Sequence, residues 1–217
     1  MARLTRQESK AQTRSKLLEA AGKVFACRGL QRATVDEVAR EAGYTKGAFY
    51  ANFKSKEDLF LTMLDERFAE RLDEIERVLD SGAPVEDQAR QAGRDFSEYL
   101  AADPTWSRLF FEFAVQAMRD EEFRRELVTR HRRIRARIAQ GFEAHADTVG
   151  GELPIPAEHV ALMSHAMADG FALARILEPE DVPDDMFETM LAVFFTGLAT
   201  LSAPASPTVV RAGVRSE

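Results

Sequence analysis

Residues 34–53 read TVDEVAREAGYTKGAFYANF, a pattern of two short helices separated by a sharp turn. Thr34, with Glu37 three residues later, forms a capping box that begins the first helix, and Gly43 ends it. Thr45 caps the second helix. The connection is too short for the helices to lie antiparallel, and a left-handed glycine suits so tight a turn. The spacing therefore predicts a helix-turn-helix, whose second helix enters the major groove of DNA.

The second of these helices has an outer face that suits contact with DNA. Phe49 and Phe53 face inward from it, toward the apolar face of the first helix. The outward residues are small or polar and include no carboxylate, so the helix can approach base edges without repelling phosphates. They are Thr45, Lys46, Gly47, Ala48, Tyr50, Ala51 and Asn52. Lys54 and Lys56 add positive charge at the start of the next helix, where free backbone N–H groups also favour a phosphate.

The net charge is divided unevenly along the chain. The whole chain has a net charge of −7 at pH 7, which by itself argues weakly against a nucleic-acid partner. Residues 1–60 hold 12 Lys+Arg and 7 Asp+Glu, a net of +5, whereas residues 61–217 hold 17 and 29, a net of −12. A basic N-terminal part on an acidic body is typical of a protein that binds a polyanion at one end, and a chance distribution is the alternative.

Composition and residue spacing predict an all-α fold of about nine helices. Apolar residues recur at steps of three and four along most of the chain, and alternating runs of Val, Ile and Thr are missing. Three short helices fall in the basic part and six in the acidic body, with breaks at 81–84, 150–156 and 179–183. The Ser/Pro/Ala-rich tail, 202–217, is expected to be disordered.

Several classes of protein are excluded by the same composition. The longest uncharged apolar stretch, 191–201, is shorter than the roughly 20 residues that a membrane helix needs. The first ten residues lack the apolar segment of a secretory signal. Cys27 is the single cysteine, so neither an internal disulfide nor a cysteine zinc site is expected. The simplest interpretation is a cytoplasmic protein without a membrane partner.

The stretch 34–59 resembles the DNA-binding module of the tetracycline-repressor (TetR) family, T-x-x-x-[IV]-A-x-x-A-G-[VY]-[ST]-x-G-x-[FLI]-Y-x-[HYN]-F-x-[SN]-K-x-x-L. The matching residues are Thr34, Val38, Ala39, Ala42, Gly43, Tyr44, Thr45, Gly47, Phe49, Tyr50, Asn52, Phe53, Ser55, Lys56 and Leu59. Asn52 is a departure, because His or Tyr is frequent there. KLLEAAGKVFACRGL, residues 16–30, is similar to the family's first helix. The resemblance implies a DNA-binding module over 10–70, with its helix-turn-helix core at 34–53, and a ligand-binding and dimerisation domain over 71–201.

The resemblance assigns DNA contacts to eight residues. Those that would hold phosphates and set the register are Thr45, Tyr50 and Lys54. Those nearest base edges would be Lys46, Gly47, Ala48 and Asn52. Thr34 would donate to a phosphate as well as cap its helix. The alternatives are a packing aromatic at Tyr50, a solvated charge at Lys54 and a tight packing point at Gly47.

The family implies a homodimeric transcriptional regulator, in most cases a repressor that a small ligand releases from a palindromic operator. The two recognition helices must lie about 34 Å apart, one DNA turn, to read a two-fold site, so a dimer is required mechanically. In the family the last two helices form a four-helix bundle with the partner copy. The residues expected at this interface are Ala166, Gly170, Ala174, Phe187, Met190, Leu191, Phe194, Phe195 and Leu198. The alternative is a monomeric core.

The family's ligand pocket lies among the middle helices, which in this sequence are rich in aromatic residues and Met. Such side chains suit a small apolar or aromatic ligand. The expected pocket residues are Phe96, Tyr99, Trp106, Phe110, Phe113, Ile134, Ile138, Met163, Met167 and Phe171. They are core residues in the alternative interpretation. Glu112 and Asp169 either attract a cationic ligand or are solvated or interface-facing acids, and RRIRAR at 132–137 is either a solvated face or a site for an anionic ligand.

No catalytic, metal or cofactor site is predicted. The patterns G-x-S-x-G, P-loop and paired carboxylates are missing from the sequence, and its four histidines lack H-x-x-x-H or H-E-x-x-H spacing. We therefore predict a non-enzymatic, ligand-responsive repressor that binds double-stranded DNA. Two alternatives stay open: an activator or protein-partnered regulator with the same module, and a helical enzyme or carrier whose helix-turn-helix is only structural.

Overall fold

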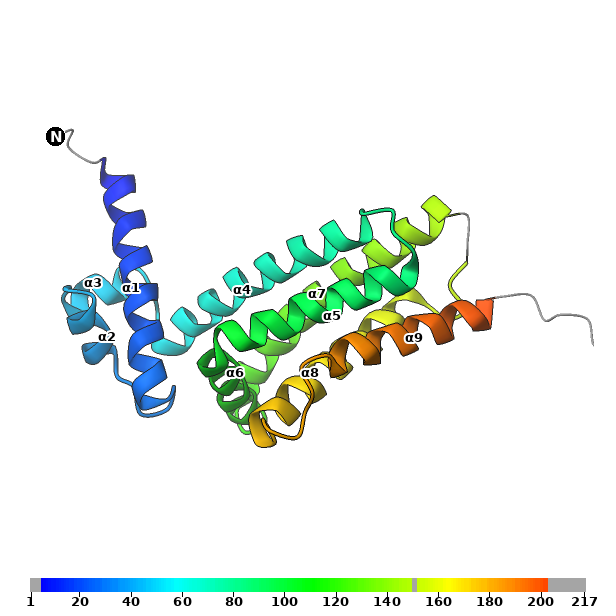
Figure 1. The fold of residues 1–217 in the computed structure, drawn as a ribbon. Coiled ribbons are helices and arrows are strands. Elements are labelled where there is room, and N and C mark those ends of the chain that lie inside the picture. Colours follow the sequence, from blue (N-terminus) through cyan, green and yellow to red (C-terminus); the bar gives the residue numbers. More distant parts are fainter. Residues whose placement is uncertain (1–4, 150–151, 203–217) are drawn as a thin grey trace, which may run out of the picture.

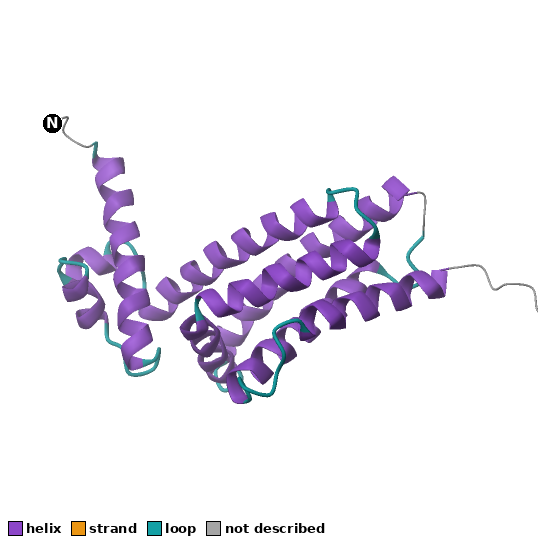
Figure 2. Ribbon diagram, viewed as in Figure 1, coloured by secondary structure: helices purple, strands orange, loops and turns teal. Residues whose placement is uncertain are grey.

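The computed structural model describes residues 5–149 and 152–202, which form nine α-helices and contain no strand (Figure 1, Figure 2). The prediction of an all-α fold with about nine helices is thus confirmed for this part of the chain. Ser202 ends the last helix. The rest of the tail that was expected to be disordered lies outside the described residues.

Three helices form the N-terminal module, namely α1 (Arg6–Arg28), α2 (Val35–Glu41) and α3 (Lys46–Tyr50). Their inner faces meet in a small apolar core that includes the fully buried Phe25, Val38 and Phe49. The helix α1 begins earlier than its apolar spacing indicated, because Thr5 forms a capping box with Glu8. The capping box also satisfies backbone donors that would otherwise be free at the start of this exposed helix.

Six helices form the second part of the molecule, namely α4 (Lys56–Leu79), α5 (Val85–Ala102), α6 (Pro104–Ala117), α7 (Glu121–Val149), α8 (Ala157–Leu177) and α9 (Met186–Ser202). Five of them run lengthwise beside one another, and the shorter α6 lies at the end of this bundle nearest the N-terminal module (Figure 1). The helix α4 is continuous from the N-terminal module to the far end of the bundle (Figure 1). A change in the tilt of α4 would therefore move the module relative to the bundle.

The junction between the two parts is built by α4 and α6. Phe60 of α4 stacks on Trp106 and Phe113 of α6, with ring centroids 5.3 and 4.9 Å apart. The carboxylate of Glu112 accepts a hydrogen bond from the backbone N–H of Leu30 at 2.9 Å. The structure thus places Phe113 in the junction and not in a ligand pocket, because it is the inward face of α6 that packs on α4. Glu112 serves the same junction and does not face a ligand.

One helix among the described residues, α8, is long and apolar enough to cross a membrane by length and composition alone. It has 21 residues and a mean hydropathy of 1.3 in its most apolar window. The sequence expectation considered only uncharged stretches and therefore passed over it. Apolar helices of this length also occur as packing elements within folded domains, and α8 packs along α7 here. The finding is weak evidence for a membrane partner.

Candidate DNA-binding surface and ligand cavity

Local hydrogen bonds hold the helix-turn-helix. The hydroxyl of Thr34 accepts from the Glu37 N–H at 3.2 Å and donates to Glu37 Oε2 at 3.0 Å. The hydroxyl of Thr45 accepts from the Ala48 N–H at 3.2 Å. Gly43 has a φ of 75°, the left-handed conformation that the turn requires. These contacts fix the start of each helix and the turn between them, and they also engage the Thr34 hydroxyl that was expected to reach a phosphate.

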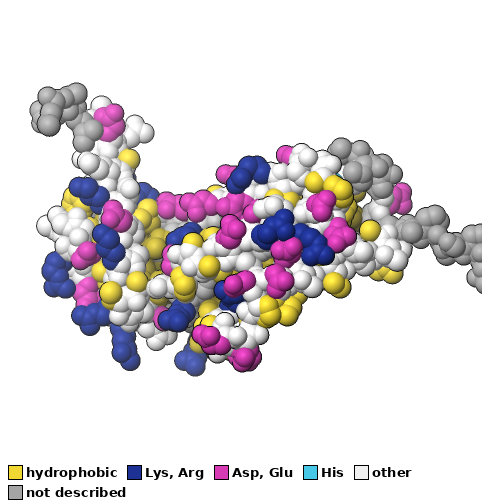
Figure 3. Space-filling view, viewed as in Figure 1, with side chains coloured by type: hydrophobic (Ala, Val, Ile, Leu, Met, Phe, Trp, Pro, Cys, Tyr) yellow, Lys and Arg dark blue, Asp and Glu magenta, His cyan; other side chains and the backbone are white. Residues whose placement is uncertain are grey.

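The outer face of α3 is open to an external partner. Tyr50 is 53% exposed. Lys46, Gly47 and Lys54 are exposed as well. A Cβ atom added to Gly47 would meet nothing closer than the Thr45 hydroxyl, at 3.7 Å, so the space beside this glycine is free for a close approach. Figure 3 shows Lys and Arg side chains gathered over the N-terminal module, with Asp and Glu side chains frequent on the bundle beside it.

Lys46 forms an ion pair inside the module. Its Nζ lies 3.0 Å from Asp36 Oδ2, and this partner raises the pKa of Lys46. Both side chains are largely exposed, so water screens the attraction and an outside acceptor can replace Asp36 at small cost. Lys46 is therefore available to a base or phosphate.

Asn52 is turned away from the outer face. Asn52 lies in the turn after α3; its Nδ2 donates to the Ala48 carbonyl of α3 at 2.8 Å, and its backbone carbonyl accepts from Arg14 of α1 at 3.1 Å. The guanidinium of Arg14 also lies over the Phe53 ring, 4.3 Å from its centroid. A short polar side chain just after a helix can bond to a backbone carbonyl of the last turn, as Asn52 does here. The expected adenine contact of Asn52 does not fit this arrangement.

Lys56 has a structural role that sequence reasoning missed. Its Nζ donates to the backbone carbonyls of Leu30, Gln31 and Ala33, each at 2.8 Å. All three ammonium donors therefore hold the loop between α1 and α2. One signal was present in the sequence: Lys56 occupies the first turn of α4, where the helix dipole disfavours a cation unless another contact holds it.

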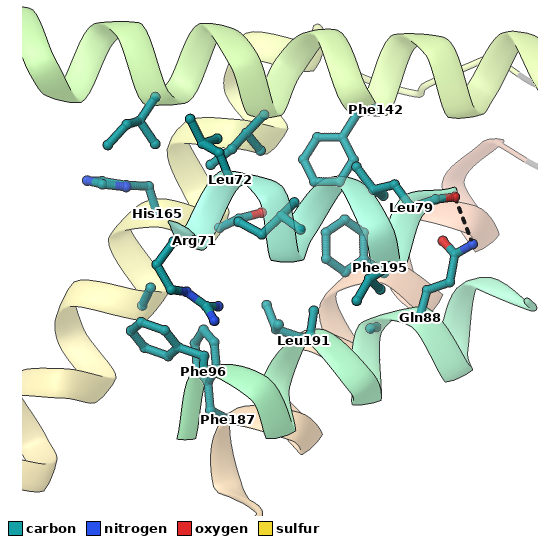
Figure 4. Close-up of a pocket in the computed structure, with 18 of the residues that line it drawn as sticks. Arg71, Leu72, Leu79, Gln88, Phe96, Phe142, His165, Phe187, Leu191 and Phe195 are labelled. Atoms are coloured by element: carbon teal, nitrogen blue, oxygen red, sulfur yellow. Dashed lines mark hydrogen bonds between the residues drawn. The ribbon is translucent and has the colours of Figure 1, made fainter. Parts of the chain in front are cut away.

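A largely apolar cavity of about 430 Å³ lies within the bundle, between α4, α5, α7, α8 and α9 (Figure 4), and residues of α6 also line it. Ligand pockets have volumes of about 300–1,000 Å³, so this one can hold a small molecule. Six of the expected pocket residues line it: Phe96, Tyr99, Trp106, Phe110, Ile134 and Ile138. Figure 4 shows Phe142 of α7, Phe195 of α9 and Leu79 of α4 around the same space.

Four expected pocket residues do not line the cavity. Phe113 lies in the junction described above. Met163 is 45% exposed on the outer side of α8. Met167 and Phe171 pack outside the cavity lining, in the cluster where the Phe171 ring lies 5.0 Å from the Phe187 ring. The reason is the helical period: α8 turns a different face toward the cavity, which aromatic density alone does not reveal.

The helix α9 uses much of its apolar stripe inside its own chain. Four residues expected at the dimer interface line the cavity instead: Phe187, Leu191, Phe195 and Leu198. Two others are half-buried, Met190 and Phe194. On α8, Ala166 and Gly170 are exposed and Ala174 is half-buried. A helix that is apolar all round gives no sign of which face meets its own chain. The sequence expectation therefore placed residues at the dimer interface that in the structure line the cavity, and another face of α9 is left for a partner.

A different apolar surface is exposed on α8 and α9, and we call it the outer apolar face. Its large residues are Leu162, Met163, Leu173, Leu177, Met186, Val193 and Leu201. On α8, Ala166, Gly170, Leu173 and Leu177 follow the adjacent pair Leu162 and Met163 at steps of three and four, so they share one side of the helix. Val193 and Leu201 are 69% and 71% exposed. So much contiguous apolar surface is typical of an interaction site.

Two histidines and an aspartate lie beside the cavity. His165 Nε2 is 3.4 Å from His131 Nδ1 and 3.6 Å from Asp169 Oδ2. Burial lowers the pKa of both histidines to about 4, so both are neutral at neutral pH. Burial also raises the pKa of Asp169. Among the described residues no group of His, Cys, Asp and Glu is arranged to hold a metal ion.

The RRIRAR run of α7 is mostly a solvated face. Arg132, Arg133 and Arg137 are exposed, and Arg137 forms an ion pair with Glu76 of α4. Arg135 is half-buried, and its charge helps to lower the pKa of His165. None of these arginines lines the cavity.

Comparison with known proteins agrees with this arrangement. Residues 17–63 match the family described as bacterial regulatory proteins, tetR family, and residues 85–201 match the family described as BetI-type transcriptional repressor, C-terminal. The chain belongs to the TetR family. It is therefore a DNA-binding transcriptional regulator of this family, with an N-terminal helix-turn-helix domain and a C-terminal helical domain.

Individual TetR-family relatives share about a third or less of their residues with this chain over the parts that align. The chain is 29% identical over 131 residues to the uncharacterized regulator YfiR of Bacillus subtilis, covering 58% of this chain and 61% of YfiR. It is 33% identical over 110 residues to the transcriptional activator FasR of Mycolicibacterium smegmatis, covering 51% and 48%. The chain thus spans less than two thirds of the length of these relatives. A solved transcriptional regulator from Rhodococcus sp. Rha1 has a TM-score of 0.67 and 27% identity, covering 86% of this chain and 96% of that one.

The open face of α3 gives a prediction that separates phosphate contacts from base contacts. Tyr50→Phe and Lys54→Ala should weaken binding to all DNA sequences alike, whereas Lys46→Ala should change the preference among operators. Because a dimer carries two copies of Lys54, Lys54→Ala should also make the slope of log K against log[salt] shallower by about 2. Tyr50→Phe leaves the charge and hence the slope unchanged. Fluorescence anisotropy with an operator and a scrambled duplex measures all of these effects, and equal losses in all three variants would contradict the division of roles.

Proposed function

We propose that this TetR-family regulator is a cytoplasmic homodimeric repressor, which a small apolar or aromatic ligand releases from a palindromic operator. The observation that carries the proposal is the position of the cavity: α4, which forms one wall, leads without a break into the DNA-binding module. A molecule that enters the cavity pushes on the helix that carries the recognition helices. This mechanism needs ligand binding and a shift of helices, and it includes no catalytic step.

The wall of the cavity supports this coupling. Phe68 and Leu72 of α4 line the cavity, and the same helix begins at Lys56 beside the loop that follows α1. On the other side, Trp106 of α6 lines the cavity and also stacks on Phe60 of α4. Ligand entry that shifts α4 or α6 therefore changes the seating of the module. A 100-fold fall in operator affinity needs about 2.7 kcal/mol of coupling free energy, which is within the usual range.

The outer apolar face supports the dimer. It lies on α8 and α9, and both Gly170 and Gly197 have open space where a side chain would stand. Small residues allow a second copy of the two helices to approach closely. Because an isologous interface repeats every contact, this face would meet itself across a two-fold axis. That symmetry would present two copies of α3 to a two-fold DNA site.

An activator with the same architecture is a second candidate, because the relative FasR is named as a transcriptional activator. The two candidates differ in the sign of the coupling or in what the bound protein does to transcription. Operator binding measured with and without ligand, followed by transcription in vitro from the same promoter, separates them. Repression that a ligand relieves supports the first candidate, and stimulated transcription supports the second.

Val193→Arg should convert the dimer into a 24.3 kDa monomer with much weaker operator binding. The side chain is 69% exposed, so the folded chain tolerates arginine there, whereas a dimer would bury two unpaired charges. Light scattering coupled to gel filtration measures the mass, and anisotropy measures DNA binding. Val115→Arg is the matched control, because Val115 is an exposed valine of α6 that lies outside the outer apolar face. A Val193→Arg variant that stays dimeric would contradict this interface.

A further inference from the structure

Arg71 brings a guanidinium into the apolar cavity. It extends from α4 toward Phe96 and Phe187 (Figure 4), and its side chain is only 13% exposed. The guanidinium carbon lies 5.3 Å from the ring centroids of both Phe96 and Tyr99. The aromatic rings therefore hold the planar group in place at the wall of the cavity, and they leave its edges open to hydrogen-bonding partners.

The guanidinium has more donors than the protein satisfies. One terminal nitrogen donates to Glu74, which lies one turn further along α4. A guanidinium carries five N–H donors, and within the described residues no other acceptor is bonded to those of Arg71. Burial lowers the pKa of Arg71, but an arginine keeps its charge in a protein. An apolar residue of similar size would suit this wall better for stability alone, so the unpaired donors point to a ligand.

The rest of the cavity defines the body of that ligand. Its lining runs along α4 from Phe68 to Leu79 and along α7 from Ile134 to Ala146. At the helical rise these spans are about 16 and 18 Å long, so the cavity is elongated along the bundle. The walls beyond Arg71 are mostly apolar, with Leu72, Ile75 and Phe142 among them. A long apolar body fits this space.

Four other titratable groups at or beside the cavity offer an anion no positive charge at neutral pH. His165 and His131 are neutral at neutral pH, for the reason given above. Asp169 lies against this histidine pair, 3.6 Å from His165, and burial disfavours its charged form. Glu152 lies in the exposed loop before α8, where water screens it. Arg71 is the one lysine or arginine among the described residues that line the cavity, so a buried anion would meet its positive charge there.

We propose that the ligand is an amphiphilic carboxylate, an elongated apolar body with one terminal carboxylate that binds bidentately to the free edge of Arg71. This inference rests on the proposed function, since it names the ligand of the same cavity. Glu74 is then the internal competitor of the ligand, because it holds one donor of the group that the ligand needs. The free edge of a guanidinium matches the two oxygens of a carboxylate in geometry as well as in charge.

Three molecules with the same ten-carbon chain test the head group: decanoate, 1-decanol and decylammonium. Isothermal titration calorimetry on the full-length protein without DNA gives their dissociation constants. Decanoate should bind about 10- to 100-fold more tightly than the other two, because hydrogen bonds to a charged group change a dissociation constant by about this factor. In Arg71→Met this preference should disappear while 1-decanol keeps its affinity. Equal affinity of the three for the wild type, no measurable binding of decanoate, or a preference that survives in Arg71→Met would overturn the inference.

Two further variants separate ligand recognition from a merely structural ion pair. Glu74→Gln removes the charge that competes for Arg71 and leaves only a weaker neutral acceptor, so decanoate should bind several-fold more tightly, whereas loss of a structural pair would only destabilise the fold. Arg67→Met is the matched control: Arg67 also lies over Tyr99 and Trp106, but it pairs with Asp103 and does not line the cavity. It should leave the preference for decanoate unchanged. Weaker decanoate binding in Glu74→Gln, or a lost preference in Arg67→Met, would count against Arg71 as the receptor.

A further titration distinguishes a free carboxylate from an acyl thioester as the ligand. Decanoyl-coenzyme A has the same chain but carries a thioester in place of the carboxylate, with its charges far from the chain. It should bind more weakly than decanoate, and tighter binding would overturn the inference. All of these titrations measure ligand binding in the absence of DNA. A negative result would therefore refute the proposed ligand without refuting the proposed repressor function. Selective binding of decanoate without any effect on the operator complex would support Arg71 as the receptor and refute release by this ligand.

Discussion

Gly93→Ala should lower the free energy of unfolding by about 3 kcal/mol, the upper part of the usual range for overpacking a core. Gly93 lies in the middle of α5, where α5 and α9 touch backbone to backbone. A Cβ atom added there would lie 2.4 Å from the Cα and 2.7 Å from the backbone nitrogen of Glu188. Neither atom can rotate away, so α9 must move as a whole. The gain in helix propensity, about 1 kcal/mol, is smaller than this cost.

Thermal unfolding at a fixed protein concentration measures the effect, which should be a fall of about 6–12 °C for a chain of this size. Gly22→Ala is the matched control in α1. A Cβ atom there would meet only the Met63 side chain, at 3.7 Å, which is an ordinary contact. That variant should be as stable as the wild type or slightly more stable. Equal melting temperatures for Gly93→Ala and Gly22→Ala would mean that α5 and α9 are not so closely packed.

Neither glycine stands out in the sequence, and this marks a limit of sequence reasoning. Gly93 reads as a weak point in a helical pattern, because the residues around it give no sign that another helix touches the backbone there. The contact depends on α9, about a hundred residues later in the chain. Arg90 and Arg94, which flank Gly93 and both pair with Glu188, look equally like ordinary solvated residues.

The DNA-binding module was predictable because its determinants are local. Thr34 and Glu37 cap each other across three residues, and Gly43 takes the left-handed conformation that the turn needs. Such signals are complete within a few residues of sequence. Asn52 shows where local reasoning fails, because the sequence does not reveal whether its side chain faces DNA or bonds to its own chain, and in the structure it bonds to the carbonyl of Ala48. Lys56 shows the same limit, since its three acceptors lie more than 20 residues away.

The bundle was predictable only in outline. Helix number and approximate boundaries follow from the apolar period, but the direction in which each apolar residue points does not. Phe110 and Phe113 lie on the same helix, and one lines the cavity while the other fills the junction. On α9, Leu191 was expected at the interface but turns inward, whereas Val193, which the expectation did not include, is exposed. Arg71 was passed over entirely, because one of three arginines in an acidic helix reads as a solvated charge.

Lys56→Met should lower the free energy of unfolding by about 3 kcal/mol and weaken binding to every DNA sequence. Methionine keeps the length of the side chain but leaves the carbonyls of Leu30, Gln31 and Ala33 without their ammonium partner. The carbonyls of Leu30 and Ala33 are partly buried, so water replaces the partner only in part. The loop between α1 and α2 then loosens, and α2 no longer holds α3 at a fixed angle to α4. Thermal unfolding, together with amide hydrogen exchange of residues 29–34, measures both effects.

Lys54→Met is the matched control for this prediction. It removes the same charge two residues earlier, from an exposed side chain that makes no hydrogen bond with the described residues through its ammonium group. Its stability should stay within about 0.5 kcal/mol of the wild type, as for most surface substitutions. Its loss of DNA affinity should shrink as salt rises, because it arises from a phosphate contact. If Lys56→Met instead melts with the wild type and loses affinity only to the extent that Lys54→Met does, then Lys56 is a phosphate contact and the three carbonyls do not depend on it.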